Sequence, residues 1–367
     1  MNKQNPKIVF TGGHAGTTAA TIASRAFDKG YGWEIHWIGP QKATEGKSHS
    51  TLEAKIFPSL GIKFHSIVTG RLQRKFTFWT IPSLLRIPWG FAEALYLLLK
   101  IRPKLILSFG GFAAFPVVVI GWSLGIPVIV HEQTTAAGRA NRASALFAKK
   151  ILLSREESRI YFPERKCQVV GNPIPEMFFN IDQKSVSTKP VIFVTGGSRG
   201  SQIINEKIRL ALPALLSKFK VIHQVGEADF DKFEKYKKEL SLGIMTEYEI
   251  VGFISPSKMA DYYAKADVVV GRSGANTVAE IIAAGKPTIF IPIPWSYLNE
   301  QSKNAQYAAK FIPVEIISQE NLNTTNLMKK IDLLLAKAEK SAFPKFENPD
   351  RSAASTITGI IEIYLKK

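Results

Sequence analysis

Short apolar runs without alternating polar positions recur along the 367-residue chain, and helix-like segments separate them. Strands that are apolar on both faces are typical of parallel sheets that helices cover on both sides. The pattern therefore predicts an α/β protein with doubly wound parallel sheets. The expected strands lie at 7–11, 33–38, 63–68, 104–109, 127–131, 149–154, 167–171, 191–195, 220–225, 247–252, 266–271, 287–293 and 314–318.

Two near copies of one motif divide the chain. KIVFTGGHAG at 7–16 and VIFVTGGSRG at 191–200 each run from a β-branched strand into a Thr-Gly-Gly turn, so we expect each to open a domain. A proline-rich polar segment precedes the second copy and is typical of a linker. The expected division is a domain at 1–172, a linker at 173–189, a second domain at 190–347, and a tail at 348–367 whose amphipathic helix packs back on the first domain.

Residues 105–130 carry no charged side chain and are long enough to cross a bilayer. Glycines and prolines interrupt this segment at loop spacings, so we interpret it as a strand, a buried helix and a second strand. No apolar run precedes the first strand, and we therefore expect no secretory signal. The single cysteine, Cys167, excludes an internal disulfide framework and fits a reducing compartment.

The charge balance is strongly basic, with 48 lysines and arginines against 30 acidic residues. A net charge of +18 predicts attraction to nucleic acid, anionic lipid or a phosphate-bearing substrate, and a merely solvated surface is the plain alternative. Neither zinc-ligand spacing nor an RNA-binding aromatic pattern nor a helix-turn-helix signal accompanies the charge. We therefore expect no nucleic-acid partner.

Cations and bulky apolar side chains mix in residues 71–104. This mixture is what a protein needs to lie on an anionic membrane surface. A long core helix that follows a basic loop would give a similar pattern, and the two interpretations are compatible. The residues expected to contact the membrane are Arg71, Arg74, Lys75, Phe76, Phe78, Trp79 and Trp89.

Three glycine turns stand where doubly wound domains bind their ligands, at the carboxyl ends of strands. The turns at 12–13 and 196–197 precede helices, so their backbone N–H groups can approach an anion. Neither turn has the dinucleotide or P-loop spacing. The third turn, GRSG at 271–274, opens a helix in which Glu280 is placed to accept two hydroxyls of a ribose. A solvent-facing glutamate is the alternative for Glu280.

Several motifs follow one another in an order that resembles the MurG family of glycosyltransferases. They are TGGH at 11–14, HEQ at 131–133, GNP at 171–173, GGSRGSQIIN at 196–205, GRSGANTVAEIIAAGKPTIFIPIP at 271–294 and NEQSKNA at 299–305. The resemblance covers nearly the whole chain. It implies a GT-B fold, in which two Rossmann-like domains face a central cleft and the second domain binds most of the nucleotide sugar.

The resemblance implies that His14 is the general base for the acceptor hydroxyl, a task that suits an imidazole of near-neutral pKa. Helix N–H groups and Arg272 would stabilise the departing UDP without a metal. The string Asp229-Phe230-Asp231 lies in a polar helix and is interpreted as surface charge. UDP-GlcNAc is the implied donor substrate, and no tightly bound cofactor is implied.

The resemblance also implies the substrate contacts. The first domain would contribute Thr11, Gly12, Gly13 and Thr134. In the second domain, Gly196, Gly197 and Ser198 would line the diphosphate, the Ile254 backbone would contact uracil, Glu280 would hold the ribose, and Gln301 would hold the sugar hydroxyls. The remaining contacts would be Arg272, Ser273, Gly274, Ala275, Asn276, Thr277, Val278 and Ala279.

The implied reaction is the inverting transfer of N-acetylglucosamine to the C4 hydroxyl of the MurNAc of lipid I, which gives lipid II for peptidoglycan synthesis. Its implied place is the cytoplasmic face of the cell membrane, as a peripheral protein. The chain departs from the family pattern at Val9-Phe10, at Thr134 and at Ile174-Pro175-Glu176. Two alternatives therefore stay open: another lipid acceptor such as diacylglycerol, and a non-catalytic nucleotide-sugar-binding protein.

Overall fold

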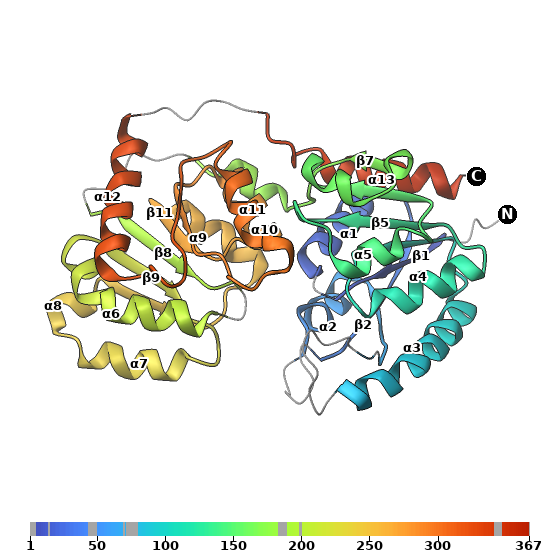
Figure 1. The fold of residues 1–367 in the computed structure, drawn as a ribbon, viewed down its shortest axis with the longest axis horizontal. Helices are drawn as coiled ribbons and strands as arrows, with labels where there is room; N and C mark the ends of the chain where they lie inside the picture. The colour runs from blue at the N-terminus through green and yellow to red at the C-terminus, as the bar shows by residue number, and fades with distance from the viewer. Residues whose placement is uncertain are drawn as a thin grey trace. The chain divides into compact units, whose positions relative to one another are not determined.

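The chain divides into two compact units, each of which is described by itself (Figure 1). Unit 1 comprises Met1–Ile174 and Pro349–Lys367, and unit 2 comprises Pro175–Asn348. The computed structural model describes residues 5–13, 15–42, 50–68, 70, 80–182, 189–197, 200–340 and 347–366, with the backbone alone at 80–85, 242, 339 and 340.

Within the described residues, unit 1 is built on a seven-stranded parallel sheet in the order β3-β2-β1-β4-β5-β6-β7. The strands are β1 (Lys7–Thr11), β2 (Glu34–Gly39), β3 (Lys63–Ser66), β4 (Leu105–Ser108), β5 (Val128–Glu132), β6 (Lys150–Leu153) and β7 (Cys167–Val169). The strands predicted for the first half of the chain are confirmed. The order in which successive strands are added to the sheet reverses between β1 and β4. Doubly wound sheets bind their ligands at that point.

Helices cover both faces of this sheet, because successive side chains of a strand point to opposite faces. Ile8 and Phe10 pack with α1 (Gly16–Asp28) and α13 (Ala353–Leu365), whereas Val9 packs with α3 (Thr80–Ile101) and α4 (Ala114–Ser123). The other helical segments are α2 (Leu52–Ile56), η1 (Pro58–Leu60), α5 (Arg139–Ser144), η2 (Glu156–Tyr161) and η3 (Glu164–Lys166).

The uncharged segment at 105–130 folds as β4, α4 and β5, as predicted. Helix α4 connects two buried strands, and its Val117 and Val118 side chains are buried in the core beside the sheet. Among the helices that the structure describes, none has the length and apolar character that crossing a membrane requires.

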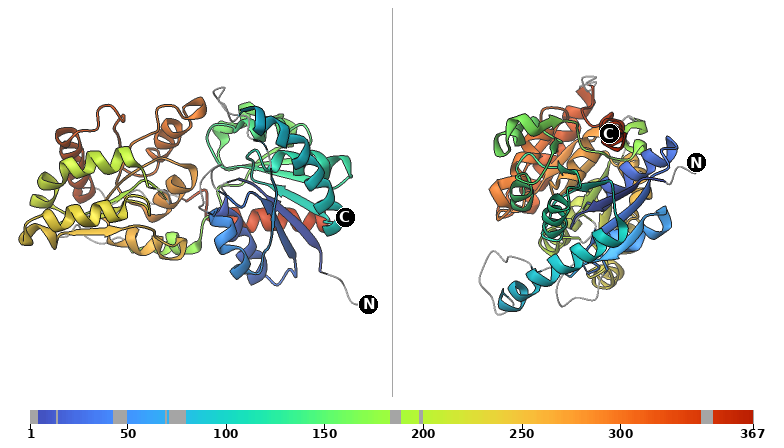
Figure 2. Two further views of the ribbon diagram at one scale, coloured as in Figure 1. Left: turned by 90° about the horizontal axis from the view of Figure 1, so that it is seen from below. Right: turned by 90° about the vertical axis from the view of Figure 1, so that its right-hand side faces the viewer.

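Helix α13 packs against α1, at the other end of the sequence, and Figure 2 shows the two side by side. Ile357 and Ile361 are fully buried in the same core as the α1 side chains. The Trp33 indole N–H donates to Glu362 Oε1 at 2.6 Å. The apolar spacing of the tail therefore has a defined partner surface in unit 1.

Within its described residues, unit 2 holds a six-stranded parallel sheet in the order β10-β9-β8-β11-β12-β13. The strands are β8 (Val191–Thr195), β9 (Lys220–Gln224), β10 (Tyr248–Val251), β11 (Val268–Gly271), β12 (Thr288–Phe290) and β13 (Val314–Ile316). The helices are α6 (Gln202–Lys218), α7 (Phe230–Glu239), α8 (Leu242–Met245), α9 (Met259–Lys265), α10 (Ala275–Ala284), α11 (Glu300–Ala308) and α12 (Thr324–Lys340), with η4 (Glu176–Asn180), η5 (Pro256–Lys258) and η6 (Tyr297–Asn299).

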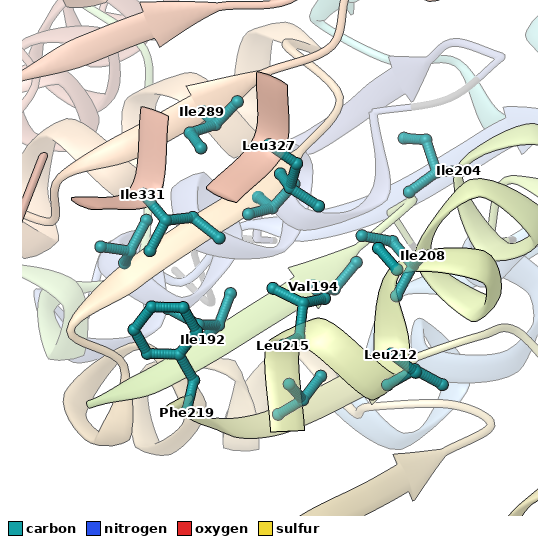
Figure 3. Packing of buried hydrophobic residues seen from close by; sticks show 14 of the residues in the cluster. Ile192, Val194, Ile204, Ile208, Leu212, Leu215, Phe219, Ile289, Leu327 and Ile331 are labelled. Atoms are coloured by element: carbon teal, nitrogen blue, oxygen red, sulfur yellow. The ribbon is translucent and has the colours of Figure 1, made fainter. Parts of the chain in front are cut away.

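One face of the second sheet packs on α6 and α12 (Figure 3). Ile192 and Val194 of β8 lie against Leu215 of α6, and Ile331 of α12 joins the same cluster; all four side chains are fully buried. The segment predicted as a linker at 173–189 begins differently from the prediction. Its first part forms η4, whose apolar Phe178 is buried against α10 and thereby joins unit 2.

Candidate functional site

In unit 2 the candidate residues gather at the carboxyl ends of the two central strands, β8 and β11. Thr195 of β8 pairs with Gly271 of β11, and a Cβ on Gly271 would lie 2.6 Å from the Thr195 carbonyl oxygen. The strand order reverses between these two strands, where doubly wound sheets bind ligands. The fold therefore brings together the glycine turns at 196–197 and 271–274, which lie far apart in the sequence.

The Thr-Gly-Gly turn after β8 has a backbone that requires glycine. Gly197 has a φ of 83°, and a Cβ on Gly196 would lie 2.3 Å from the Ser201 nitrogen. The Gly197 N–H donates to Thr195 Oγ1 at 3.0 Å. This hydrogen bond holds the turn in place without a ligand. Ser198, the predicted diphosphate contact of this turn, lies outside the described residues.

The N-terminus of α10 is open to an anion. Gly274 precedes the helix without a side-chain cap, and the first turn holds no acidic residue. Ser273 is fully buried, yet its Oγ has no hydrogen-bond partner within the described part of the chain. The N–H groups at a helix N-terminus and the helix dipole favour a negatively charged ligand at this point. The first turn consists of the predicted residues Ala275, Asn276 and Thr277, which are half-buried together with Gly274.

Val278 and Ala279, which are predicted substrate contacts, lie in the middle of α10. Both side chains are buried in the core of unit 2. The Val278 N–H donates to the Gly274 carbonyl oxygen at 2.9 Å, as the helix requires. These two residues therefore anchor the helix against the sheet, and their contact with the substrate stays a prediction.

Arg272 is a buried cation that connects three parts of the site. Its guanidinium donates to the Ile291 carbonyl oxygen at 2.8 Å, to Ser201 Oγ at 3.0 Å and to Gln319 Oε1 at 2.9 Å. All three acceptors are neutral, and burial lowers the pKa of Arg272. The side chain therefore holds the ends of β11 and β12 and the start of α6 together, and adds a positive charge behind the glycine turns.

Glu280 lies on α10 beyond the open first turn. Its Oε2 accepts a hydrogen bond from the buried Tyr263 hydroxyl at 3.4 Å, the one partner that the described residues give it. Burial raises the pKa of Glu280 to about 8, although part of the side chain still meets solvent. Its other carboxylate oxygen is left for an outside hydroxyl donor.

Gln301 and Ile254 keep polar groups that the protein does not use. Gln301 Oε1 accepts from the Ile293 N–H at 3.0 Å, and this hydrogen bond fixes the orientation of the side-chain amide. The Nε2 donors of that amide have no partner among the described residues. Ile254 is buried, but within the described chain neither its N–H nor its carbonyl oxygen is hydrogen-bonded. Sequence analysis did not single out Asn304, whose Nδ2 donates to the Ser273 carbonyl oxygen at 3.1 Å. Asn304 lies one helical turn after Gln301, so the helical spacing places the two side chains on the same face of α11.

In unit 1 the turn after β1 packs on the loop after β4. The Gly13 N–H donates to the Gly110 carbonyl oxygen at 3.1 Å. Gly111 has a φ of 90°, and a Cβ there would lie 3.1 Å from the Gly13 nitrogen, so the close approach requires glycine. Thr11 is buried and Gly12 continues the turn. His14, the predicted base, lies outside the described residues.

The start of α1 differs from that of α10 because a carboxylate of the protein occupies it. Glu53 is buried, and its Oε1 accepts from the Ala15 N–H at 3.0 Å. This hydrogen bond already satisfies part of the helix N-terminus. This bond spans 38 residues of sequence, so sequence analysis had no pattern that would reveal it. The turn of unit 1 therefore suits a neutral group better than a phosphate.

Glu132 of the HEQ motif organises the loop between β5 and α5. Its carboxylate accepts from the Thr134 N–H at 3.1 Å, the Thr134 hydroxyl at 2.9 Å, the Gly138 N–H at 3.0 Å and Asn141 Nδ2 at 2.9 Å. Burial raises the pKa of Glu132. Thr134, a predicted substrate contact, thus donates its hydroxyl to Glu132. Asn141 packs against Gly110, which joins this loop to the turn after β4.

One side of unit 1 exposes large apolar side chains on α3 and α4. Trp89, Tyr96 and Trp122 are 63%, 61% and 55% exposed. The Trp89 indole N–H donates to Glu93 Oε1 at 2.9 Å, and the Lys100 ammonium lies 5.6 Å from the Tyr96 ring centre. The other predicted membrane contacts lie outside the described residues; they are Arg71, Arg74, Lys75, Phe76, Phe78 and Trp79.

Both halves of the chain match models of one enzyme family. The glycosyltransferase family 28 N-terminal domain matches residues 8–153, and the family 28 C-terminal domain matches residues 191–362. A UDP-N-acetylglucosamine–N-acetylmuramyl-(pentapeptide) pyrophosphoryl-undecaprenol N-acetylglucosamine transferase of Legionella pneumophila (strain Paris) is 33% identical, over 92% of this chain and 91% of that protein. Transferase 2 of the same name from Bacillus cereus (strain ATCC 14579) is 31% identical, over 91% of this chain and 93% of that protein.

Solved structures share the fold. Acinetobacter baumannii MurG superposes with a TM-score of 0.65 at 21% identity, over 98% of this chain and 99% of that one. A Methanocaldococcus jannaschii UDP-GlcNAc 2-epimerase in complex with UDP-GlcNAc and UDP gives 0.64 at 14% identity, over 98% and 99%. The predicted pair of Rossmann-like domains of the GT-B type is thus confirmed. Two family models and relatives of more than 30% identity place this chain in glycosyltransferase family 28, as a member of the MurG family.

Proposed function

We propose that the protein is an inverting hexosyltransferase that moves N-acetylglucosamine from UDP-GlcNAc to the C4 hydroxyl of the MurNAc of lipid I, giving lipid II. The observation that carries this proposal is the open N-terminus of α10, where the unpaired Ser273 hydroxyl and the helix N–H groups suit a diphosphate. Glu280, further along the helix, has a carboxylate oxygen for ribose hydroxyls. The unused backbone groups of Ile254 suit uracil, and the Gln301 amide suits the sugar.

The proposed chemistry needs one base and one stabilised leaving group. The His14 imidazole takes the proton of the acceptor hydroxyl, whose oxygen then attacks the anomeric carbon. The bond from that carbon to the diphosphate oxygen breaks, its electron pair leaves with UDP, and the configuration inverts. The α10 N–H groups and the charge of Arg272 stabilise the negative charge that develops on UDP.

The exposed apolar face of unit 1 supports a peripheral position at the cytoplasmic face of the cell membrane. Trp89, Tyr96 and Trp122 present aromatic surface, and the Lys100 ammonium lies beside the Tyr96 ring. Aromatic side chains next to cations suit the interface of an anionic bilayer. An acceptor that is anchored in lipid requires such contact.

The direct test supplies the purified protein with radiolabelled UDP-GlcNAc and a lipid I analogue in anionic vesicles. We expect label to enter the lipid fraction, and His14→Ala to reduce the rate at least a thousandfold while UDP binding persists, because only the base is lost. His65→Ala, at another histidine of unit 1, is the matched control and should keep activity. Undiminished transfer by His14→Ala would exclude His14 as the base.

The same assay separates the alternatives. Diacylglycerol replaces the lipid I analogue in a parallel reaction, and labelled product in that reaction alone would favour a different lipid acceptor. Binding of UDP-GlcNAc without transfer to either lipid would favour a non-catalytic nucleotide-sugar-binding protein. Each of these results contradicts the proposed reaction.

A further inference from the structure

Unit 1 contains a groove of about 290 Å³ between α3, α4 and α5, and none of its lining residues has a part in the proposed function. Its walls are mainly apolar and include Ile87 and Phe91 of α3, Phe112 and Phe115, and Ala143 of α5. The rings of Phe91 and Phe115 meet edge to face, with centroids 6.4 Å apart. Among the residues that line the groove, Arg139 is the one ionisable side chain. The lining therefore suits an apolar ligand that carries a negative charge at one end.

The groove begins beside the turn on which the proposed chemistry takes place. Phe112 directly follows Gly111, which lies in close contact with Gly13, the residue before His14. Ser108 of β4 pairs with Thr11 of β1, so the loop that carries Phe112 and the Thr-Gly-Gly turn leave the same edge of the sheet. A ligand with its polar end at this turn can place an apolar tail in the groove.

The groove opens to solvent at one of its walls, because Phe112 is 40% exposed. A volume near 300 Å³ is at the lower end of small-molecule sites, so it suits part of a chain rather than a whole lipid. Side chains from three helices enclose the groove, so a bound hydrocarbon chain contacts protein on several sides. A flat surface that faces the bilayer would contact such a chain on one side.

We propose that this groove binds the diphosphate-proximal part of the acceptor's prenyl chain, with Arg139 on the side of the phosphates. The inference rests on the proposed function, because that function supplies an acceptor in which a prenyl chain is joined to a diphosphate. The groove then selects the acceptor by its chain and holds the sugar near His14. Contact with the bilayer by Trp89 and Tyr96 is a separate interaction that the groove does not replace.

Two substitutions of equal size separate the groove from the membrane face. Ala143→Phe places a ring in the groove, whereas Ala92→Phe adds the same ring at an exposed position of α3 that does not line it. The probe is farnesyl diphosphate below its micelle concentration, with isopentenyl diphosphate as the short-chain reference, and calorimetry measures both affinities without any membrane. We expect the wild-type protein and Ala92→Phe to prefer the long chain by at least tenfold, because burying each CH₂ group is favourable.

Ala143→Phe should lose this chain-length preference and retain its affinity for UDP. Preference for the long chain in Ala143→Phe, or its absence in the wild-type protein, would overturn the proposal. A circular dichroism spectrum equal to that of the wild-type protein shows that Ala143→Phe folds, and Ala143→Leu serves as a smaller filling variant. Binding of farnesyl diphosphate without transfer to lipid I would retain the groove and refute the proposed function, so the two failures are distinguishable.

Discussion

The starts of α1 and α10 differ in the side chains beside them, and this difference favours a different kind of ligand at each helix. At the start of α1, the Glu53 carboxyl group accepts a hydrogen bond from the Ala15 N–H. The start of α10 has no acidic residue in its first turn and adds the unpaired Ser273 hydroxyl. A diphosphate would meet a carboxylate at α1 and hydrogen-bond donors at α10. The turn of unit 1 is therefore suited to an acceptor hydroxyl, and that of unit 2 to the donor.

Glu280 predicts a pH dependence of nucleoside binding. Its pKa of about 8 means that it is mostly protonated at pH 7, whereas the ionised carboxylate is the better acceptor for two ribose hydroxyls. The affinity for uridine should therefore rise roughly tenfold as the pH rises from 6.5 to 8.5. Calorimetric titration with uridine, which has no phosphate to titrate, measures this change.

The variant Glu280→Gln is the control for this prediction, because it keeps the shape of the side chain and cannot ionise. Its affinity for uridine should be weaker and independent of pH over the same range. A wild-type affinity that stays constant between pH 6.5 and 8.5 would contradict the assignment of Glu280 to the ribose.

At the scale of residues, sequence patterns predicted positions better than partners. The GRSG turn and the helix after it placed Glu280 correctly on α10, because motif and spacing are local properties. The pKa of Glu280 depends on burial beside Tyr263, 17 residues away, and no local pattern encodes that contact. The hydrogen bond from Asn141 to Glu132, nine residues away, is likewise outside any local pattern. The roles of such residues follow from tertiary packing.

At the scale of elements, the apolar runs predicted every strand of both described sheets. Strands buried on two faces must be apolar throughout, so their positions are visible in the sequence. The predicted linker shows the limit of this argument. Its polar and proline-rich composition hides η4, which packs against α10 and whose Phe178 ring contacts Tyr263 of α9. The composition indicated a connection between domains, whereas the packing of η4 against α10 places residues from Pro175 onwards in unit 2.

The segment that leads into α13 is attached to unit 1 by a buried ion pair. Asp350 Oδ2 accepts from Arg155 Nη2 at 2.7 Å, and its Oδ1 accepts from the Asn172 N–H at 2.7 Å. Both charged side chains are almost completely buried. We expect Asp350→Asn to lower the free energy of unfolding of unit 1 by about 3–5 kcal/mol, because it leaves the Arg155 charge buried without a counter-ion. Urea unfolding followed by tryptophan fluorescence measures this loss.

The matched control for Asp350→Asn is Lys366→Gln, which removes the exposed pair between Lys366 and Glu362 on the same helix. Exposed pairs contribute little, so this variant should unfold almost as the wild-type protein does. The double variant Arg155→Met with Asp350→Leu should recover part of the loss, since no charge then remains buried. Equal unfolding curves for Asp350→Asn and Lys366→Gln would show that the buried pair does not hold the tail.

At the scale of the whole molecule, the described residues of each unit include a buried histidine whose pKa is lowered and a buried carboxyl group whose pKa is raised. In unit 1, burial lowers the pKa of His131 to about 4 and raises that of Glu132. In unit 2, burial lowers the pKa of His223 to about 3 and raises that of Glu280 to about 8. His223 is fixed in its neutral form between the Tyr248 hydroxyl at 3.0 Å and Asn205 Oδ1 at 3.2 Å.

These groups affect stability with opposite signs. A buried histidine binds its proton more weakly in the folded state, so its contribution is full above pH 6.5 and is lost as the pH falls towards the folded pKa. A carboxyl group with a raised pKa keeps its proton in the folded state, so its contribution is full below pH 4.5 and is lost as the pH rises towards the folded pKa. Between pH 4.5 and 6.5 the two effects oppose each other within each unit.

Unit 2 of the wild-type protein should therefore unfold with a nearly constant free energy between pH 5 and 6.5, and removal of His223 should expose the opposing carboxyl group. In His223→Gln, the free energy of unfolding of unit 2 should fall as the pH rises, by up to about 1.4 kcal/mol per pH unit for the proton held by Glu280, and by less because Glu280 still meets solvent. Unit 1, in which burial also lowers the pKa of His36 and His65, is the unaltered reference in this variant. Hydrogen exchange of β9 in unit 2 and of β5 in unit 1, measured by mass spectrometry at pH 5, 5.5, 6 and 6.5, follows each unit separately. The double variant His223→Gln with Glu280→Gln should restore the flat profile, and a slope that persists in it would assign the pH dependence to other groups.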